Sequence, residues 1–330
     1  MSQSPRSAPD RSVSPKPKRR GVFRRLARGT LVLLAIVGIP FGLYVTWVSH
    51  QLPSVSRLGE ENPERTNYMR LAISEGQLPE NFAVTWLPLS SMSNALVCGV
   101  VKAEDTIFFQ HRGFNYRQTL LAIHGRLNGR VVGHSTITMQ LARNLFLGPE
   151  QTFERKLREI LLTRDLEREV PKQRILQLYL NIMELGPGIW GVGQASQYYF
   201  QKQPAQLDAF EGTLLAAIAP APRQPLEGPN RERARKKQAS VLWRMFISGL
   251  LGPEQYQSLA LRHQVLFQAL EKGVSLQEAL RIPTPADVQP PPVPFRVVTE
   301  EIPEERMLEE SCGYRSELGY YTGPNPVPKF

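Results

Sequence analysis

The chain has 330 residues, of which 42% are hydrophobic, and this is enough for one large folded domain or two small ones. Its two cysteines, Cys98 and Cys312, exclude a framework of several disulfides and a four-cysteine zinc site. The net charge of +10 lies mostly in residues 1–29, where nine basic residues accompany one acid, so the rest of the chain lacks the basic surface of a nucleic-acid-binding domain.

The basic N-terminal tail, residues 1–29, precedes an uncharged segment, residues 30–48, that predicts a transmembrane helix. At ~1.5 Å per residue its nineteen residues, TLVLLAIVGIPFGLYVTWV, nearly match the ~30 Å hydrocarbon core of a bilayer. The alternative is a cleaved signal peptide, but the apolar run is too long and no A-x-A-like site follows it. The positive-inside rule then leaves the tail in the cytoplasm and everything after residue 50 outside.

The spacing of apolar residues divides the remaining chain into four parts. Residues 49–92 form a polar, proline-containing stalk with an apolar lead-in, and residues 93–251 have helical spacing with little strand alternation. Residues 252–281 predict two short helices, and residues 282–330 open with IPTPADVQPPPVP, which predicts a linker and a tail. The sequence therefore predicts an all-α domain with a tail.

The first segment that suggests chemistry is EDTIFFQHRG, residues 104–113, directly after the apolar helix ALVCGVVKA. A carboxylate at that place can keep one apolar wall and one open side, the setting that suits proton transfer. A solvated helix end is the alternative for an isolated acidic pair. Cys98, within the apolar helix, is interpreted as a core residue, and a bond to Cys312 is allowed outside the cytoplasm but not required by the sequence.

The second segment is GHSTITMQLARN, residues 133–144. Ser135 or Thr136 can cap a helix there, and the N–H groups of a helix N-terminus suit an anion such as phosphate. Gln140 and Arg143 share a face with Thr136. The preceding stretch GRLNGRVVG, with three glycines, predicts a mobile loop. An ordinary capped helix without a ligand is the alternative.

The third segment, FERKLREIL at residues 153–161, places Arg155, Lys156 and Glu159 on one helix face through i,i+3 and i,i+4 spacing. Two cations beside a carboxylate suit a pyrophosphate, whereas a solvated salt-bridged face is the alternative. Four apolar residues of the same helix are expected to face the core: Phe153, Leu157, Ile160 and Leu161. The fourth segment, ILQLYLN at residues 175–181, predicts core, with Asn181 ordering a neighbouring segment.

Four motifs in this order, E-D-x-x-F-x-x-H-x-G, G-x-S-T-I-T-x-Q-L-x-R-N, R-K-x-x-E and I-L-x-x-Y-L-N, resemble the glycosyltransferase 51 family of peptidoglycan glycosyltransferases. The resemblance covers about residues 62–250, and NPERTNYMR, WLPLSSMSNAL and LNIMELGPGIWGV look like the stand-alone Gram-negative members. It implies a lysozyme-like helical domain on the periplasmic side of the bacterial inner membrane. It also implies polymerisation of lipid II into glycan strands, with release of undecaprenyl diphosphate and inversion at the sugar carbon.

The resemblance carries roles onto particular residues. Glu104 is expected to deprotonate the 4-hydroxyl of the acceptor, and Glu159 to assist departure of the diphosphate, directly or through a divalent cation (magnesium or manganese). No tightly bound cofactor is expected. Ten further positions are expected to bind substrate: Asp105, Phe108 and His111 around Glu104, then Ser135, Thr136, Gln140 and Asn144 from the second segment, and Arg143, Arg155 and Lys156 against the diphosphate.

Some positions depart from the family pattern. Met139 stands in place of a common glutamine, Arg143 in place of a frequent lysine, Gln151 where some relatives have a cation, and Lys237 in place of a usual arginine. Neither glutamate is affected, so the departures bear on donor affinity more than on chemistry. The sequence has no S-x-x-K or K-T-G motif, so transfer without transpeptidation is expected.

The expected partners are lipid II, the growing glycan strand, membrane lipid and proteins of cell-wall synthesis or division, without nucleic acid. Two other classes stay open. A lysozyme-like glycan hydrolase would also use a glutamate, but it has no diphosphate to hold, so the R-K-x-x-E cluster argues against it. A catalytically silent cell-wall scaffold would be favoured by loss of Glu104 or Glu159, and both are present.

Overall fold

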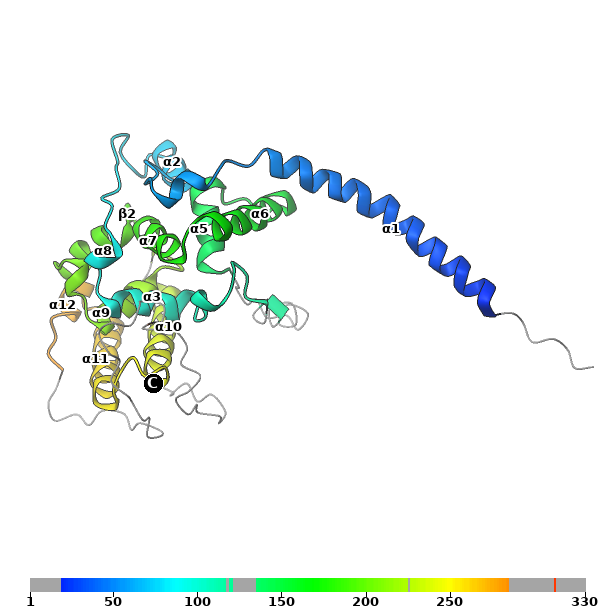
Figure 1. Cartoon of the computed structure of the whole chain (residues 1–330). Coiled ribbons are helices and arrows are strands. Elements are labelled where there is room, and N and C mark those ends of the chain that lie inside the picture. The colour runs from blue at the N-terminus through cyan, green and yellow to red at the C-terminus, as the bar shows by residue number, and fades with distance from the viewer. Residues whose placement is uncertain (1–18, 117–118, 121–134, 225, 285–311, 313–330) are drawn as a thin grey trace, which may run out of the picture. The chain divides into compact units, whose positions relative to one another are not determined.

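A computed structural model describes residues 19–116, 119–120, 135–224, 226–284 and 312 (Figure 1). The chain divides into two compact units, Met1–Leu52 and Pro53–Phe330, and each is described by itself. The predicted mobile loop at residues 125–133 lies outside the described residues. So does nearly all of the predicted linker and tail.

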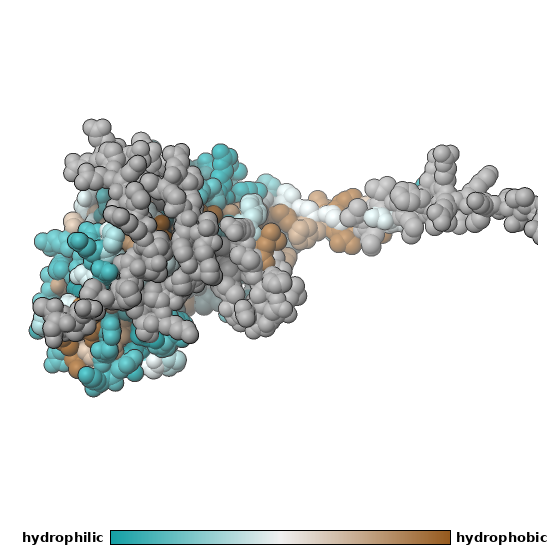
Figure 2. All heavy atoms as spheres, turned by 90° about the horizontal axis from the view of Figure 1, so that it is seen from below, coloured by the Kyte–Doolittle hydropathy of each residue, from teal (hydrophilic) through white to brown (hydrophobic). Residues whose placement is uncertain are grey.

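The first unit contains one long helix, α1 (Arg19–His50), which begins well before the predicted residue 30. Its segment Arg28–His50 is long and apolar enough to cross a membrane, and a signal sequence near the N-terminus would have the same properties. Apolar side chains are exposed along this segment, and they form a hydrophobic surface on the helix (Figure 2). Exposed apolar side chains on a helix of this length suit contact with lipid.

Three helices form the centre of the second unit: α3 (Asn94–Glu104), α9 (Ala209–Ile218) and α10 (Gly228–Ile247). Ser93 caps α3 by accepting a hydrogen bond from the Leu96 N–H, and every residue of α9 is buried. The backbones of α3 and α9 approach so closely that a Cβ at Gly212 would lie 2.6 Å from Leu96 Cα. This close packing fixes α3, and with it Glu104 at its last position.

A second group of helices packs beside this centre: α2 (Asn67–Ser74), α5 (Ile137–Phe146), α6 (Phe153–Glu169) and α7 (Lys172–Ile182). Thr136 and Thr152 cap α5 and α6 by accepting hydrogen bonds from backbone N–H groups three residues on. The predicted orientation of α6 is half right. Leu157 and Leu161 are buried, but Phe153 is 69% exposed and Ile160 is 40% exposed, because the apolar stripe of this charged helix is narrower than expected.

A short antiparallel hairpin follows α7, formed by β1 (Glu184–Gly186) and β2 (Ile189–Trp190), and it leads into α8 (Gly191–Phe200). The sequence did not predict these strands. Gly191 has a φ of +77°, and a Cβ there would lie 2.4 Å from the Asn181 carbonyl oxygen, so only glycine fits. The Asn181 side chain bonds both the N–H and the C=O of Leu87 at 2.9 Å, which confirms that it orders a neighbouring segment.

The C-terminal helices of the described chain are α11 (Pro253–Glu271) and α12 (Leu276–Ala279), so one of the two helices predicted for residues 252–281 is long. His263 of α11 is buried and hydrogen-bonds the Gln238 side chain of α10 at 3.1 Å. Burial lowers the pKa of His263 to about 4, so the ring is neutral at neutral pH. The described residues also include four short 3₁₀ helices: Ser56–Gly59, Leu89–Ser91, Phe108–Gln110 and Pro204–Gln206.

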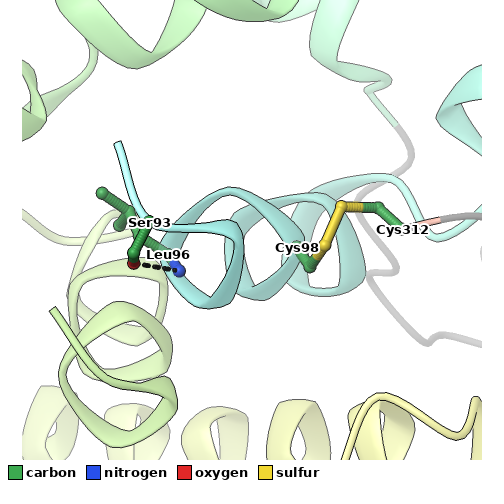
Figure 3. Close-up of a disulfide and its surroundings, with 4 residues drawn as sticks. All are labelled: Ser93, Leu96, Cys98 and Cys312. Carbon is green, nitrogen blue, oxygen red and sulfur yellow. Dashed lines mark hydrogen bonds between the residues drawn. A yellow bond between two sulfur atoms is a disulfide. The ribbon is translucent and has the colours of Figure 1, made fainter. Parts of the chain in front are cut away.

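Cys98, in the middle of α3, forms a disulfide with Cys312 (Figure 3). The two residues are 214 positions apart, their Cα atoms lie 5.0 Å from each other, and both side chains are buried. The interpretation of Cys98 as a plain core residue is therefore incomplete. The bond attaches a point of the C-terminal segment to the helix that ends at Glu104.

Replacing Cys312 with serine is expected to lower the free energy of unfolding by ~2–5 kcal/mol, because a native disulfide restricts the unfolded chain. Cys312 is the better choice than Cys98, since a serine at residue 98 would also place a hydroxyl inside α3. Chemical denaturation of the full chain in detergent measures the change, and non-reducing peptide mapping identifies the bond. Two titratable thiols in the unreduced, denatured protein would contradict this pairing.

Candidate active site

A cleft of about 570 Å³ opens between the two groups of helices. Its walls come from α2, α3, α5, α7, α10, the hairpin and the turn after α9. The lining residues are Tyr68, Ala103, Glu104, Ser135, Gln140, Arg143, Asn144, Tyr179, Met183, Glu184, Trp190, Ala219, Pro220, Pro222 and Lys237. Five of the residues predicted for the site are among them: Glu104, Ser135, Gln140, Arg143 and Asn144.

Glu104 occupies the last position of α3, and its side chain is only 12% exposed. Each carboxylate oxygen has its own donor. Gln140 Nε2 donates to Oε2 at 2.8 Å, and Lys237 Nζ donates to Oε1. Because both partners are donors, they pair with the carboxylate form, and a carboxylate facing the cleft can accept a proton from a bound group. The alternative of a fully solvated helix end does not describe this residue.

Asp105, the next residue, is not among the residues that line the cleft. Its buried carboxylate pairs with His111 Nε2 at 2.9 and 3.0 Å and accepts from the Ile137 N–H at 3.2 Å. Phe108 is fully buried and packs its ring edge to face with the His111 ring. These three residues are brought together, but they connect the end of α3 to the start of α5 and do not face the cleft.

The residues of α5 and its N-cap have different roles at the site. Thr136 is buried, caps the helix and donates to the Gly113 carbonyl oxygen at 2.7 Å, so it does not line the cleft. Met139 is 7% exposed, so the methionine that replaces the family's glutamine occupies a core position. Arg143 and Asn144, one to two turns further along the helix, lie in the cleft wall. Among the described residues, the Arg143 guanidinium makes no hydrogen bond or ion pair.

The predicted charge cluster of α6 is present, but its carboxylate is hidden. Glu159 has no exposed surface, and its two oxygens accept hydrogen bonds from Arg155 Nη1 and Lys156 Nζ. Arg155 Nε is buried without a hydrogen-bond partner in the described part of the chain. Tyr68 lines the cleft; burial raises its pKa, and the charges of Arg143 and Arg155 act in the opposite direction.

The residues around Glu159 do not fit a divalent cation. Both carboxylate oxygens already accept from positively charged groups, and a metal ion there would compete with these cations. Within the described residues no three acidic, histidine or cysteine side chains gather as a ligand set.

Three residues of the site region were not predicted. They are Glu184 and Trp190 of the hairpin and Arg223 of the turn after α9. Glu184 lines the cleft and accepts from Arg223 Nε at 3.4 Å, and Trp190 forms part of the same wall. Burial raises the pKa of Glu184, while Arg223 lowers it. The segment LNIMELGPGIWGV marked this region only through its resemblance to a family, because its residue pattern alone indicates no chemistry.

Comparison with known proteins agrees with these motifs. A family model described as Transglycosylase matches residues 73–246. A biosynthetic peptidoglycan transglycosylase of Thiobacillus denitrificans is 37% identical over 210 residues, which are 62% of this chain and 87% of that protein. Its namesake from Dechloromonas aromatica is 33% identical over 222 residues, 66% of this chain and 96% of the relative. The namesake from Bdellovibrio bacteriovorus is 41% identical over 140 residues, but only 42% of this chain and 56% of the relative are aligned.

Proposed function

This chain belongs to the transglycosylase family, and from that premise we propose that it polymerises lipid II into glycan strands and releases undecaprenyl diphosphate. The observation that carries the proposal is the composition of one cleft. It contains a paired carboxylate, Glu104, and a cation, Arg143, that has no acidic partner among the described residues. A base and an anion site in one cleft are what attack by a hydroxyl on a sugar diphosphate requires.

In the proposed reaction Glu104 takes the proton of the acceptor's 4-hydroxyl. The hydroxyl oxygen then attacks the anomeric carbon of the donor, and the bond from that carbon to the diphosphate oxygen breaks. The electron pair of this bond stays on the diphosphate, and attack from the opposite face inverts the sugar carbon. Lys237 and Gln140 hold the two oxygens of Glu104, so the base keeps a fixed orientation before the acceptor arrives.

Stabilisation of the departing diphosphate is assigned to Arg143, Arg155 and Lys156. Arg143 lies in the cleft wall, Arg155 has an unpartnered buried Nε–H, and the side chain of Lys156 is 42% exposed. Glu159 is buried behind the last two, so in this proposal it aligns them and does not itself touch the phosphates. Fixed cations at a place where negative charge develops lower the barrier to bond cleavage.

The proposed location is the periplasmic side of the inner membrane, with α1 as a single-pass anchor and the N-terminus in the cytoplasm. Two observations support it. The apolar part of α1 is long enough to span a bilayer, and the basic residues precede it. The disulfide between Cys98 and Cys312 is a bond that persists in oxidising compartments and is rare in the cytosol.

The full chain, solubilised in detergent and supplied with labelled lipid II, tests the proposal. A ladder of glycan strands supports polymerisation. If transpeptidation is absent, adding a β-lactam should leave this product unchanged. Cleavage of preformed glycan without a ladder would replace the proposal with the hydrolase. Binding of lipid II without turnover of either substrate would replace it with the scaffold, in which the tail recruits cell-wall proteins.

Replacing Lys237 with glutamine is expected to lower the polymerisation rate by about 10- to 100-fold, because a hydrogen bond to a charged group contributes ~1.5–3 kcal/mol. Lys237→Arg should retain more activity, since a guanidinium also donates to a carboxylate. Initial rates with labelled lipid II measure both. Lys236→Gln is the matched control, because Lys236 is 72% exposed and pairs with Glu232 outside the cleft. Equal losses in the residue 236 and 237 variants would contradict the assigned contact.

A further inference from the structure

We propose that Tyr179 is a positioning residue for the general base, and that it acts by fixing the side-chain amide of Gln140. This inference rests on the proposed function of Glu104. Tyr179 lies on α7 within the segment ILQLYLN, which the sequence marks only as core, and it is 2% exposed. Its hydroxyl donates to Gln140 Oε1 at 3.1 Å, and Gln140 Nε2 donates to Glu104 Oε2 at 2.8 Å.

The orientation of the Gln140 amide matters for Glu104. The two ends of the Gln140 amide have nearly the same shape, but one end only accepts hydrogen bonds and the other only donates. If the amide turned over, its oxygen would face the Glu104 carboxylate, and a hydrogen bond would be replaced by repulsion between two acceptors. The orientation of Gln140 therefore decides whether Glu104 is supported or opposed.

Two acceptors select the supporting orientation of Gln140, and the Tyr179 hydroxyl, which can donate or accept, then holds the amide oxygen in place. On the Nε2 side there are two acceptors, the Glu104 carboxylate at 2.8 Å and the Ser135 carbonyl oxygen at 3.5 Å. On the Oε1 side there is one donor, the Tyr179 hydroxyl. Phenylalanine in place of Tyr179 would keep the ring but remove this donor, so the amide would lose the only bond that holds its oxygen among the described residues.

Tyr179 can perform this role only while its hydroxyl keeps its proton. Burial raises the pKa of Tyr179 well above its ordinary value, and the negative charge of Glu104 acts in the same direction. The hydroxyl is therefore a donor at every pH at which a transfer assay is run. The network then runs from α7 through α5 to the end of α3, and it connects the base on α3 to two other helices.

Tyr179→Phe tests the inference in the full chain, with lipid II polymerisation measured against pH. We expect kcat to fall about tenfold with a smaller change in KM, because the base is misoriented while substrate contacts remain. We also expect the acid limb of the pH–rate profile to move to higher pH, since an ionised carboxylate that loses a donor is less favoured. Tyr199→Phe is the matched control, because this buried hydroxyl donates to the Leu185 carbonyl oxygen at 2.8 Å and lies outside the cleft.

A double variant shows whether Tyr179 acts through Gln140. In a Gln140→Leu background, Tyr179→Phe should cause no further loss, and multiplicative losses would overturn the inference. The inference would also be overturned if Tyr179→Phe left the acid limb of the pH–rate profile unchanged and lost only as much stability as Tyr199→Phe. If Tyr179→Phe does not fold, an acid limb in Gln140→Leu identical to that of the wild type overturns it. Failure of the wild type to polymerise lipid II would instead count against the proposed function.

Discussion

Glu104→Gln is expected to lower the rate of glycan-strand formation by about 10²- to 10⁴-fold, the usual contribution of a general base. Glutamine has nearly the same shape, but its single amide oxygen can replace only one of the two carboxylate oxygens that accept from Lys237 and Gln140, and its amide cannot take the proton of the acceptor hydroxyl. The folded domain should persist, because Glu104 lies at a cleft wall and not in the core. Initial rates with labelled lipid II and a thermal melt of the same sample measure the two effects.

The control for this prediction is Glu232→Gln. Glu232 lies on α10, its side chain is 43% exposed, and it pairs with Arg235 and Lys236 outside the cleft. Its replacement should leave the rate within about twofold of the wild type, because Glu232 does not line the cleft. A surface ion pair also contributes only ~1 kcal/mol or less to stability. A Glu104→Gln enzyme that keeps more than a tenth of the wild-type rate would remove Glu104 from the role of base.

Glu159→Gln is expected to damage both stability and activity, in contrast to Glu104→Gln. Glu159 is fully buried between Arg155 and Lys156, so removal of its charge leaves Arg155, which is itself mostly buried, without a counter-ion. Breaking a buried pair in this way costs ~3–5 kcal/mol of stability. Polymerisation should fall more than tenfold in the molecules that remain folded, because the two cations lose their alignment toward the diphosphate.

Denaturant unfolding of the full chain in detergent, together with initial rates below the unfolding transition, measures these effects. Glu154→Gln on the same helix is the matched control, because the Glu154 and Arg158 side chains are 48% and 24% exposed and their pair should contribute ~1 kcal/mol or less. If Glu159→Gln unfolds at the same denaturant concentration as Glu154→Gln, then Glu159 is not the buried counter-ion described here.

Local sequence signals predicted the parts of the fold that depend on local chemistry. The N-cap at Ser135 or Thr136 and the spacing of Arg155, Lys156 and Glu159 depend on contacts over three or four residues. Such contacts lie within a single turn of helix, so they can be predicted without knowledge of the tertiary structure. The helical class of the domain follows for the same reason.

Other features depend on contacts between distant segments, and the sequence did not predict them. The hairpin at residues 184–190 is too short to show strand alternation, so Glu184 and Trp190 were missed as cleft residues. The complete burial of Glu159 and the exposure of Phe153 depend on the segments that pack against α6. Helical periodicity does not identify those segments. The resemblance assigned Asp105 to the wall around Glu104, whereas its carboxylate contacts His111 and the Ile137 N–H, a long-range arrangement that the motif alone does not give.

The disulfide has a topological consequence for the cleft. Cys98 and Cys312 close a covalent ring that contains every cleft residue after position 98, from Ala103 to Lys237, and leaves only Tyr68 outside. One backbone cut anywhere in that ring opens it but releases no fragment, because the two pieces stay joined through sulfur. A nicked molecule would therefore keep Glu104, Arg143 and Arg155 in one covalent body, and would separate into two chains only after reduction.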